Sequence, residues 1–221
     1  MKKAYYEAYE ERYRTVHEKG LRWTSPEPTP VVMDVIRRYG IGKDAPILEI
    51  GCGEGRDTVY LLKEGYRLKA TDISKEVIDY CRRQYPEYAE AFYVQDILKE
   101  DADGQYDLVI AVAVVHMLTE DADRKAFWQF IRNHLSVSGK ALVCSMGDGE
   151  HAVRSDPTQA FELKEREHAS GKILVPATTC RMVTWQEFEE EIAESGLKIT
   201  EKGMTASPPE FDSLMYAVVS L

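Results

Sequence analysis

The sequence has little cysteine, no long apolar run and no excess of basic residues. Its 221 residues include 4 cysteines, and no two of them form the C-x-x-C pair typical of zinc sites. No stretch approaches the roughly 18 consecutive apolar residues of a membrane helix, and the opening MKKAYYEAYEERYR lacks the apolar centre of a signal peptide. We therefore expect a cytoplasmic protein with no metal centre and no membrane partner.

Basic residues are outnumbered by acidic ones. The 28 Lys and Arg against 38 Asp and Glu give a formal net charge of −10. Because nucleic-acid affinity depends largely on neutralising phosphates, this charge opposes nucleic acid as a principal partner, although a local basic patch is compatible with it. The length suits one α/β domain with a modest cap. Monomer and homodimer both remain open.

The stretch PILEIGCGEGRDTVYLLKEGYRLKATD, residues 46–72, predicts a strand, a glycine turn, a helix and a second strand. Ile47 to Ile50 is a short apolar run of the kind found in buried parallel strands. The glycines that follow allow positive φ and a close approach of the backbone to a ligand. Asp72 ends the second strand about 20 residues after the first glycine, where an acid in such units accepts ribose hydroxyls. These features predict a nucleoside-binding βαβ unit.

Two residues, Arg56 and Glu49, distinguish between a dinucleotide and another nucleoside cofactor as the ligand of this unit. A dinucleotide-binding turn needs a glycine at its sixth position, which here is Arg56. Glu49 precedes the first glycine, where a carboxylate would repel a pyrophosphate but attract the ammonium of S-adenosylmethionine (SAM). Glu49-x-Gly51-x-Gly53-x-Gly55 followed by Asp72 resembles motifs I and II of the class I SAM-dependent methyltransferases.

This resemblance implies a fold and a reaction. The expected fold is α/β and Rossmann-like: a seven-stranded, mostly parallel sheet with helices on both faces, an antiparallel last strand and an N-terminal helical cap. The implied cofactor is SAM, with S-adenosyl-L-homocysteine (SAH) as product. Within the class, GCGEGRDTVYLLKEGYRLKATDIS is similar to the tellurite-resistance and thiopurine methyltransferases, which act on small molecules.

The resemblance also implies further cofactor contacts. Asp96, after a predicted strand at 91–94, matches the acid that accepts from the adenine amino group, and Ile73 and Ile97 match residues that hold the adenine ring. A capping role is the alternative for Asp96. The full predicted cofactor set is Glu49, Gly51, Cys52, Gly53, Gly55, Arg56, Asp72, Ile73, Asp96, Ile97 and Ala111, with Cys52 expected to pack rather than to act as a nucleophile.

His116 is the candidate general base. It follows the fourth predicted strand, 106–115, which is almost wholly apolar and therefore central. Ligands bind at the carboxyl ends of such strands, and histidine titrates near neutrality. Methyltransferases often work by alignment alone, so the alternative is that His116 forms a wall of the site or begins a helix.

The acceptor is expected to meet the N-terminal cap and an insertion. Tyr5, Tyr9 and Tyr13 recur at helical spacing, so this stripe either packs on the sheet or closes over the acceptor. We assign Tyr6, Trp23, His116 and Arg181 to the acceptor site, with Arg154 as a second cation for an acidic acceptor, although a solvated surface position is the commoner fate of both arginines. The predicted divisions of one domain, 1–221, are a cap at 1–40, a core at 41–145, an insertion at 146–183 and a C-terminal part at 184–221.

Local patterns predict the remaining elements. We expect a helix over 123–135, a break at Ser138-Gly139 and a fifth strand over 140–145. A charged helix is expected over 158–169, and Thr184 with Glu187 predicts a capping box. Two final strands are expected over 197–202 and 212–219.

The predicted function is methyl transfer from SAM to the sulfur, selenium, tellurium, oxygen or nitrogen of a small-molecule acceptor. The alternatives are a protein or RNA methyltransferase and a SAM-binding protein without transfer activity. A nicotinamide oxidoreductase is a more distant alternative, because the sixth glycine of its turn is missing.

Overall fold

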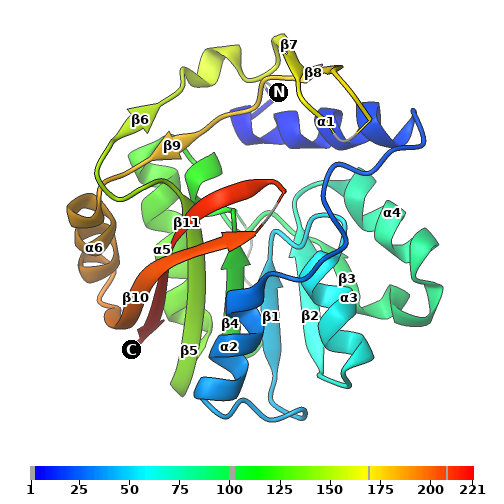
Figure 1. Cartoon of the computed structure of the whole chain (residues 1–221). Helices are drawn as coiled ribbons and strands as arrows, with labels where there is room; N and C mark the ends of the chain where they lie inside the picture. The colour runs from blue at the N-terminus through cyan, green and yellow to red at the C-terminus, as the bar shows by residue number, and fades with distance from the viewer. Residues whose placement is uncertain (1–2, 100–102, 169, 208) are drawn as a thin grey trace.

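The computed structural model describes residues 3–99, 103–168, 170–207 and 209–221. Its centre is a seven-stranded sheet in the order β10-β11-β5-β4-β1-β2-β3 (Figure 1). The strands are β1 (Ile47–Ile50), β2 (Leu68–Asp72), β3 (Phe92–Val94), β4 (Tyr106–Val112), β5 (Leu135–Met146), β10 (Lys198–Ser207) and β11 (Phe211–Ser220). Strands β1 to β5 are parallel, and β11 is antiparallel to both of its neighbours. This arrangement confirms the predicted fold class.

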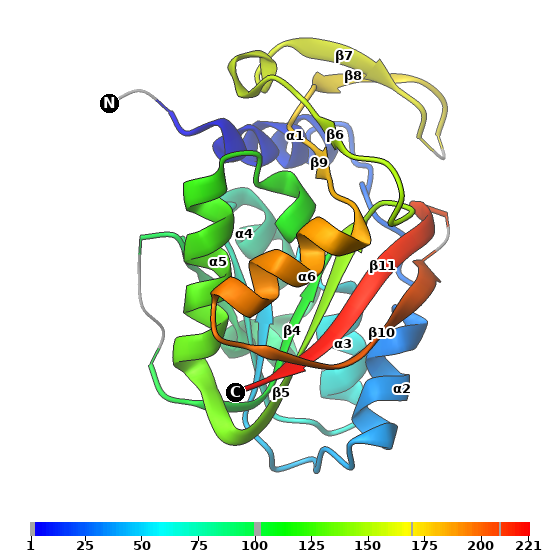
Figure 2. The ribbon, with the colours of Figure 1, turned by 90° about the vertical axis from the view of Figure 1, so that its left-hand side faces the viewer.

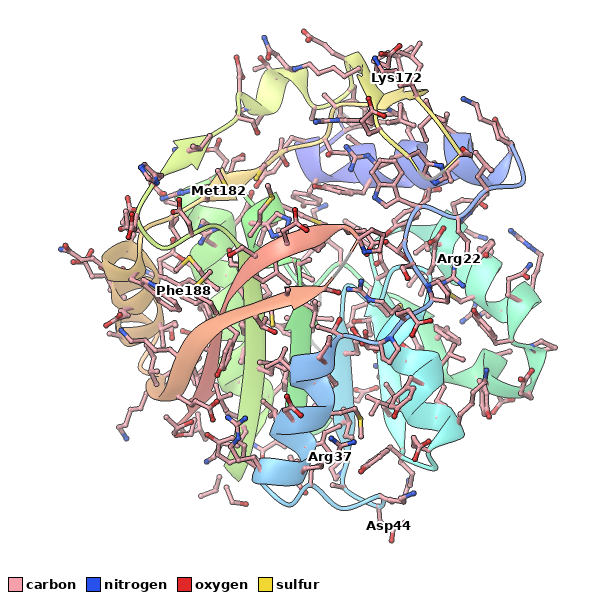
Figure 3. The ribbon with its side chains drawn as sticks, in the orientation of Figure 1. Arg22, Arg37, Asp44, Lys172, Met182 and Phe188 are labelled. Carbon is pink, nitrogen blue, oxygen red and sulfur yellow. The ribbon has the colours of Figure 1, made fainter. Side chains whose placement is uncertain are left out.

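Helices cover both faces of the sheet because successive strand residues point to opposite sides. The helices are α2 (Pro30–Arg38), α3 (Arg56–Lys63), α4 (Lys75–Gln84), α5 (Asp121–His134) and α6 (Trp185–Glu194). On β1, Leu48 and Ile50 pack with the apolar residues of α5 and α6, including Phe188 (Figure 3). Ile47, which precedes Leu48, packs with apolar residues of α2 and α3 on the opposite face. The ribbon in Figure 2 shows α2 and α3 on the side of the sheet away from α5 and α6.

A cap lies over the carboxyl ends of the central strands (Figures 1 and 2). It contains the short 3₁₀ helix η1 (Tyr5–Glu7), α1 (Ala8–His17) and the two-stranded sheets β6–β9 (Val153–Arg154 and Arg181–Met182) and β7–β8 (Leu163–Arg166 and Ile173–Pro176). Val16 of α1 packs on Ile173 and Val175 of β8. The N-terminal helix and the segment 153–182, which are far apart in the sequence, therefore form one layer above the carboxyl ends of the strands.

The helix expected over 158–169 is wrong. Asp156 accepts from the N–H of Thr158 and caps the 3₁₀ turn η4 (Pro157–Gln159), after which the chain pairs as β7 with β8. Strand β8 carries the apolar residues that bury against α1. Pairing with a buried strand outweighed the helix propensity of the charged segment, because propensity is a weak term beside tertiary contacts.

Three other boundaries also differ from expectation. Strand β4 ends at Val112 because Ala113 takes a left-handed φ of 59°. Strand β5 begins at Leu135, and Ser138-Gly139 falls within it, where the β4–β5 register shifts. The last two strands are longer than expected, since β10 and β11 pair along most of their length. Short additional 3₁₀ helices are η2 (Pro86–Ala91) and η3 (Val115–Met117).

Among the described residues, no helix combines the length and the apolar character needed to cross a bilayer.

Candidate functional site

The turn after β1 brings backbone, rather than side chains, to the carboxyl end of the sheet. Gly51 and Gly53 have φ values of 67° and 52°, in the left-handed region that favours glycine. A Cβ on Gly51 would lie 2.4 Å from Cγ2 of Val114, and one on Gly53 would lie 3.0 Å from the Tyr13 hydroxyl. The turn is therefore closed to larger residues by the segment after β4 and by the cap.

Asp72 holds this turn from the end of β2. Its Oδ2 accepts the N–H of Gly53 at 3.0 Å, and its Oδ1 accepts the N–H of Ser74 at 2.9 Å. Burial raises the pKa of this carboxyl to about 6, although the two backbone donors oppose the rise. Each oxygen retains further acceptor capacity, which the hydroxyls of a ribose can fill.

A cavity of about 90 Å³ lies between the sheet edge and the cap. From the core, the lining residues that sequence reasoning proposed are Gly51, Asp72, Ile73, Asp96 and Ile97, and from the cap it is Tyr6. Residues far apart in the sequence thus meet as expected at one edge of the sheet.

Asp96 lines the same cavity as Asp72. Its Oδ1 accepts the N–H of Leu98 at 3.1 Å, and its Oδ2 accepts the hydroxyl of Tyr6 at 3.4 Å and pairs with Lys99 at 2.8 Å. The carboxylate therefore caps the local turn, as the alternative interpretation held, and also faces the cavity.

Sequence reasoning missed several lining residues. Tyr9 and Tyr13 belonged to the tyrosine stripe but had no assigned role, and the helical spacing that places them beside Tyr6 was the available signal. The others had no distinctive local pattern: Ile50, Thr71, Gln95, Leu98, Val114, Met117 and Leu118.

Other predicted cofactor residues support the turn from outside the cavity. Glu49 points to the α3 face, where it accepts the Thr58 hydroxyl at 2.5 Å. Burial, with the nearby charge of Asp57, raises the pKa of Glu49 to about 8. Ala111 is fully buried in β4. Glu49 and Ala111 are absent from the lining, as are Cys52, Gly53, Gly55 and Arg56.

Arg56 and Cys52 have partners within the protein. Arg56 pairs with Glu210 at 3.3 Å and lies 3.8 Å from Asp57. The Cys52 thiol is buried, and burial raises its pKa well above the usual value. A thiol of this kind is a poor nucleophile, as expected for a packing residue.

His116 is buried beside the cavity rather than in its lining. Its Nδ1 accepts the N–H of Met146 at 3.1 Å, and its ring meets Phe211 edge-on. Burial, followed by the charge of Arg124, lowers the pKa of His116 to about 3. This geometry disfavours a general base, and His116 lies in the 3₁₀ helix η3, in line with the helix alternative.

The three cationic or aromatic residues proposed for the acceptor lie outside the cavity lining. Arg181 donates to the Thr119 carbonyl at 3.0 Å and pairs with Asp121, while Arg154 pairs with Glu120 at 2.8 Å. Trp23 lies beside the cap helix, with the Arg12 guanidinium 4.7 Å from its ring.

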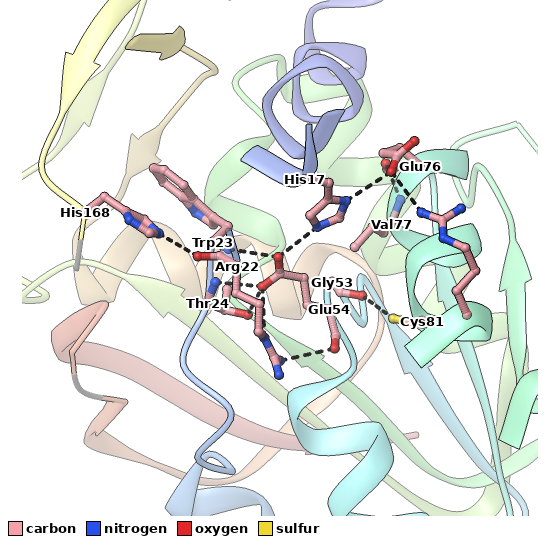
Figure 4. Close-up of polar contacts among 12 residues, drawn as sticks. His17, Arg22, Trp23, Thr24, Gly53, Glu54, Glu76, Val77, Cys81 and His168 are labelled. Atoms are coloured by element: carbon pink, nitrogen blue, oxygen red, sulfur yellow. Dashed lines mark hydrogen bonds and ion pairs between the residues drawn. The ribbon is translucent and has the colours of Figure 1, made fainter. Parts of the chain in front are cut away.

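Glu54, in the glycine turn, joins the cap to the core (Figure 4). Its carboxylate accepts the N–H groups of Trp23 and Thr24 and the Thr24 hydroxyl, each at 2.8 Å. His17 of α1 lies between Glu54 and Glu76, with its two ring nitrogens 2.9 and 3.1 Å from their oxygens. Burial raises the Glu54 pKa, but hydrogen bonds from His17 and Thr24 outweigh it and leave this pKa below its usual value.

Residues 47–139 match the family model described as Methyltransferase domain. The 1,6-didemethyltoxoflavin-N1-methyltransferase of Burkholderia thailandensis superposes with a TM-score of 0.70, covering 100% of this chain and 92% of that one at 16% identity. The fold is that of the class I methyltransferases.

Curated methyltransferases are similar over part of the chain. Malonyl-[acyl-carrier protein] O-methyltransferase of Bacillus anthracis is 29% identical over 113 residues, which are 50% of this chain and 41% of that protein. The tRNA (carboxymethyluridine(34)-5-O)-methyltransferase alkbh8 of Xenopus tropicalis is 28% identical over 121 residues, 54% of this chain and 18% of that protein. The chain thus spans less than half the length of these relatives.

Proposed function

We propose that the protein is a SAM-dependent methyltransferase with a small-molecule acceptor. The observation that carries this proposal is the arrangement of Asp72, which holds the left-handed glycine turn and also lines the cavity. The methyltransferase domain match over residues 47–139 supports the same conclusion. Solved structures of this fold contain SAM or SAH, which supports SAM as the cofactor here.

The residues present fit this cofactor. Asp72 would accept the ribose hydroxyls through the acceptor capacity that its two backbone donors leave free. Asp96 would accept from the adenine amino group, and Ile73 and Ile97 would provide apolar walls for the ring. The glycine turn would leave room for the methionine portion.

SAM supplies a methyl carbon on a sulfonium: an acceptor atom forms its bond to this carbon as the bond to sulfur breaks, and SAH leaves. The protein's task is to align the acceptor and exclude water, and alignment alone corresponds to effective molarities of about 10⁵ to 10⁸ M. A thiolate, selenide or telluride would arrive as an anion and need no base. An oxygen or amine acceptor would lose its proton to solvent, because the lowered pKa of His116 makes it a weak base and its Nδ1 already accepts the N–H of Met146.

The cap favours a small acceptor. Helix α1 lines the cavity through Tyr9 and Tyr13, and the 146–183 insertion packs on α1. Within one domain of 1–221, we assign both to acceptor selection. The toxoflavin-precursor enzyme named above is a structural neighbour that acts on a small molecule. A tellurite- or thiopurine-type acceptor remains within this proposal. RNA is the second candidate, because one similar protein is a tRNA methyltransferase.

Two measurements test the proposal. Calorimetry with SAM, SAH and NADH should show binding of the first two only, and NADH binding without SAM binding would refute the cofactor assignment. A labelled-methyl transfer screen over thiols, metalloid anions, phenols, amines and small acids should then identify an acceptor. SAM binding with no transfer to any small molecule would instead favour a macromolecular acceptor or a protein without transfer activity.

A further inference from the structure

Arg12, on α1, is a buried cation without a carboxylate partner. Its side chain is only 7% exposed, and it makes no ion pair with any described residue. Its Nη2 donates to the carbonyls of Pro176 and Ala177, at 3.0 and 2.8 Å, and to Oγ1 of Thr178 at 2.5 Å. Nε is buried without a partner, and Nη1 donates to no described residue.

A second arginine increases the charge at this place. Arg166 of β7 donates through Nη2 to the same Ala177 carbonyl, at 3.1 Å, and likewise has no ion pair within the described part of the chain. Burial, and the charge of Arg166, lower the pKa of the Arg12 guanidinium, although Tyr9 opposes this effect. Two like charges that share one acceptor repel each other, so the protein alone leaves the pair uncompensated.

The surroundings of Arg12 contain aromatic rings rather than acids. Its guanidinium lies 5.3 Å from the ring centre of Tyr9 and 4.7 Å from that of Trp23. Aromatic faces attract a cation but do not neutralise it. Tyr9 also lines the cavity, whereas Arg12 packs beside it and is itself absent from the lining.

The absence of an acid here contrasts with the rest of the chain. The sequence has 38 Asp and Glu against 28 Lys and Arg, and the other candidate clamps, Arg154 and Arg181, are each paired with an acid. A buried charge is normally paired because desolvation without a partner costs several kcal/mol. Of the two buried arginines in the described part of the chain, Arg124 pairs with Glu191, whereas Arg12 has no acid partner.

We propose that Arg12, with Arg166 beside it, binds a carboxylate of the ligands of the methyl-transfer site. The identity of these ligands rests on the proposed function, whereas the positive charge of the pair does not. The carboxylate has two possible sources: an acidic acceptor or the methionine end of the cofactor. In either case the guanidinium Nη1 donates to the ligand oxygen, and the arginine pair excludes neutral analogues.

The acceptor arm of the test uses benzoate as a probe and neutral benzamide as its control. Thermal stabilisation of the SAH-saturated protein is measured for wild type, Arg12→Gln, Arg166→Gln and the matched control Arg14→Gln, which changes an exposed arginine of the same helix. We expect benzoate to stabilise wild type and Arg14→Gln, and to bind Arg12→Gln about tenfold more weakly or worse. Arg166→Gln should weaken it by about twofold to fivefold.

The cofactor arm compares SAH with 5′-methylthioadenosine, which lacks the amino-acid portion. If the cofactor supplies the carboxylate, Arg12→Gln weakens SAH about tenfold or more and leaves 5′-methylthioadenosine unchanged. If the acceptor supplies it, SAH affinity stays near the wild-type value and only benzoate binding falls.

Two outcomes overturn the proposal. One is equal stabilisation by benzoate and benzamide together with unchanged SAH affinity in Arg12→Gln. The other is an effect of Arg12→Gln on stability without ligand but not on either affinity, which is the signature of a purely structural role. If Arg12→Gln does not fold, the benzoate and SAH affinities of Arg166→Gln test the proposal instead. This variant should fold, because Arg166 is exposed and Arg12 keeps its contacts.

The same measurements distinguish a wrong cofactor assignment from a wrong carboxylate subsite. Wild type that binds neither SAM nor SAH would refute a SAM-dependent enzyme, and benzoate would then be tested without SAH. Benzoate binding that Arg12→Gln abolishes would still support the carboxylate subsite, whereas benzoate binding that Arg12→Gln leaves intact would refute it.

Discussion

Asp72 receives hydrogen bonds from the backbone of two different elements, the glycine turn and the start of α4. Its carboxylate therefore fixes the shape of the turn and presents the same oxygens to the cavity. We expect Asp72→Ala to bind SAM about tenfold or more weakly, because a hydrogen bond to a charged group contributes about 1.5 to 3 kcal/mol. Calorimetry measures this affinity.

The matched control is Asp148→Ala, which removes an exposed aspartate from the loop after β5. It should leave SAM affinity unchanged. Circular dichroism should show both variants folded, and wild-type affinity in a folded Asp72→Ala protein would contradict the ribose assignment.

Glu49 predicts a pH dependence of stability. Its pKa is about 8 in the folded protein and 4.5 when unperturbed, so the folded state binds more protons between these values. Stability then falls as pH rises from about 4.5 to 8. Glu49→Gln cannot ionise, so its urea unfolding free energy should fall less steeply with pH than that of wild type. Identical slopes for the two proteins would show that Glu49 titrates normally.

His116 should not contribute a protonation step to turnover near neutrality. Its pKa is lowered to about 3 and its Nδ1 already accepts the N–H of Met146. Once an acceptor is known, His116→Gln should retain the wild-type shape of the pH–rate profile between pH 5.5 and 8.5. Loss of an ionisation near pH 6.5 in the variant would restore the general-base hypothesis.

At the scale of elements, the cap is attached to the cofactor turn through Glu54. Its carboxylate accepts two backbone N–H groups of the segment after α1, and His17 of α1 itself lies beside it. Because the group is buried and its pKa is lowered, it contributes stability at neutral pH that is lost as pH falls through the folded pKa. Glu54 is thus one of the links between the cap and the core, beside the contacts of Glu10 with the start of α4.

Glu54→Gln should loosen the cap without unfolding the sheet. We expect a loss of about 3 kcal/mol, as for removing one partner of a buried ion pair, and faster hydrogen exchange over residues 8–25. Glu64→Gln, at an exposed position near the end of α3, is the matched control. Equal exchange rates in Glu54→Gln and wild type would show that the other contacts of the cap hold it in place.

At the scale of the whole molecule, the net charge of −10 bears on the second candidate function. Binding of an RNA releases counterions from phosphates and requires clustered Lys and Arg. We expect no measurable binding of transfer RNA at 0.15 M salt in a filter-binding assay. Binding that weakens steeply between 0.05 and 0.2 M salt would reveal a basic surface and favour an RNA acceptor.

The sequence alone determined the β1–glycine turn–α3–β2 unit, because its signals are local. Apolar runs, glycine spacing and Asp72 at a strand end each act within a few residues, and the structure brings Asp72, Ile73, Asp96 and Ile97 to one cavity. The partner of Glu49 was not local information. Packing of α3 on β1 brings the Thr58 hydroxyl to this carboxylate, on the side of the sheet away from the cavity lining.

Only the tertiary structure decided how the cap is built. The segment 158–169 has helix-forming residues, yet it pairs with β8 because that strand buries its apolar residues on α1. Arg12 and Arg166 are more than 150 residues apart and meet only through this packing. Charge compensation depends on distances in space, so the sequence indicated Arg154 and Arg181 for acceptor recognition, whereas in the described part of the folded chain both are paired and the buried Arg12 has no acid partner.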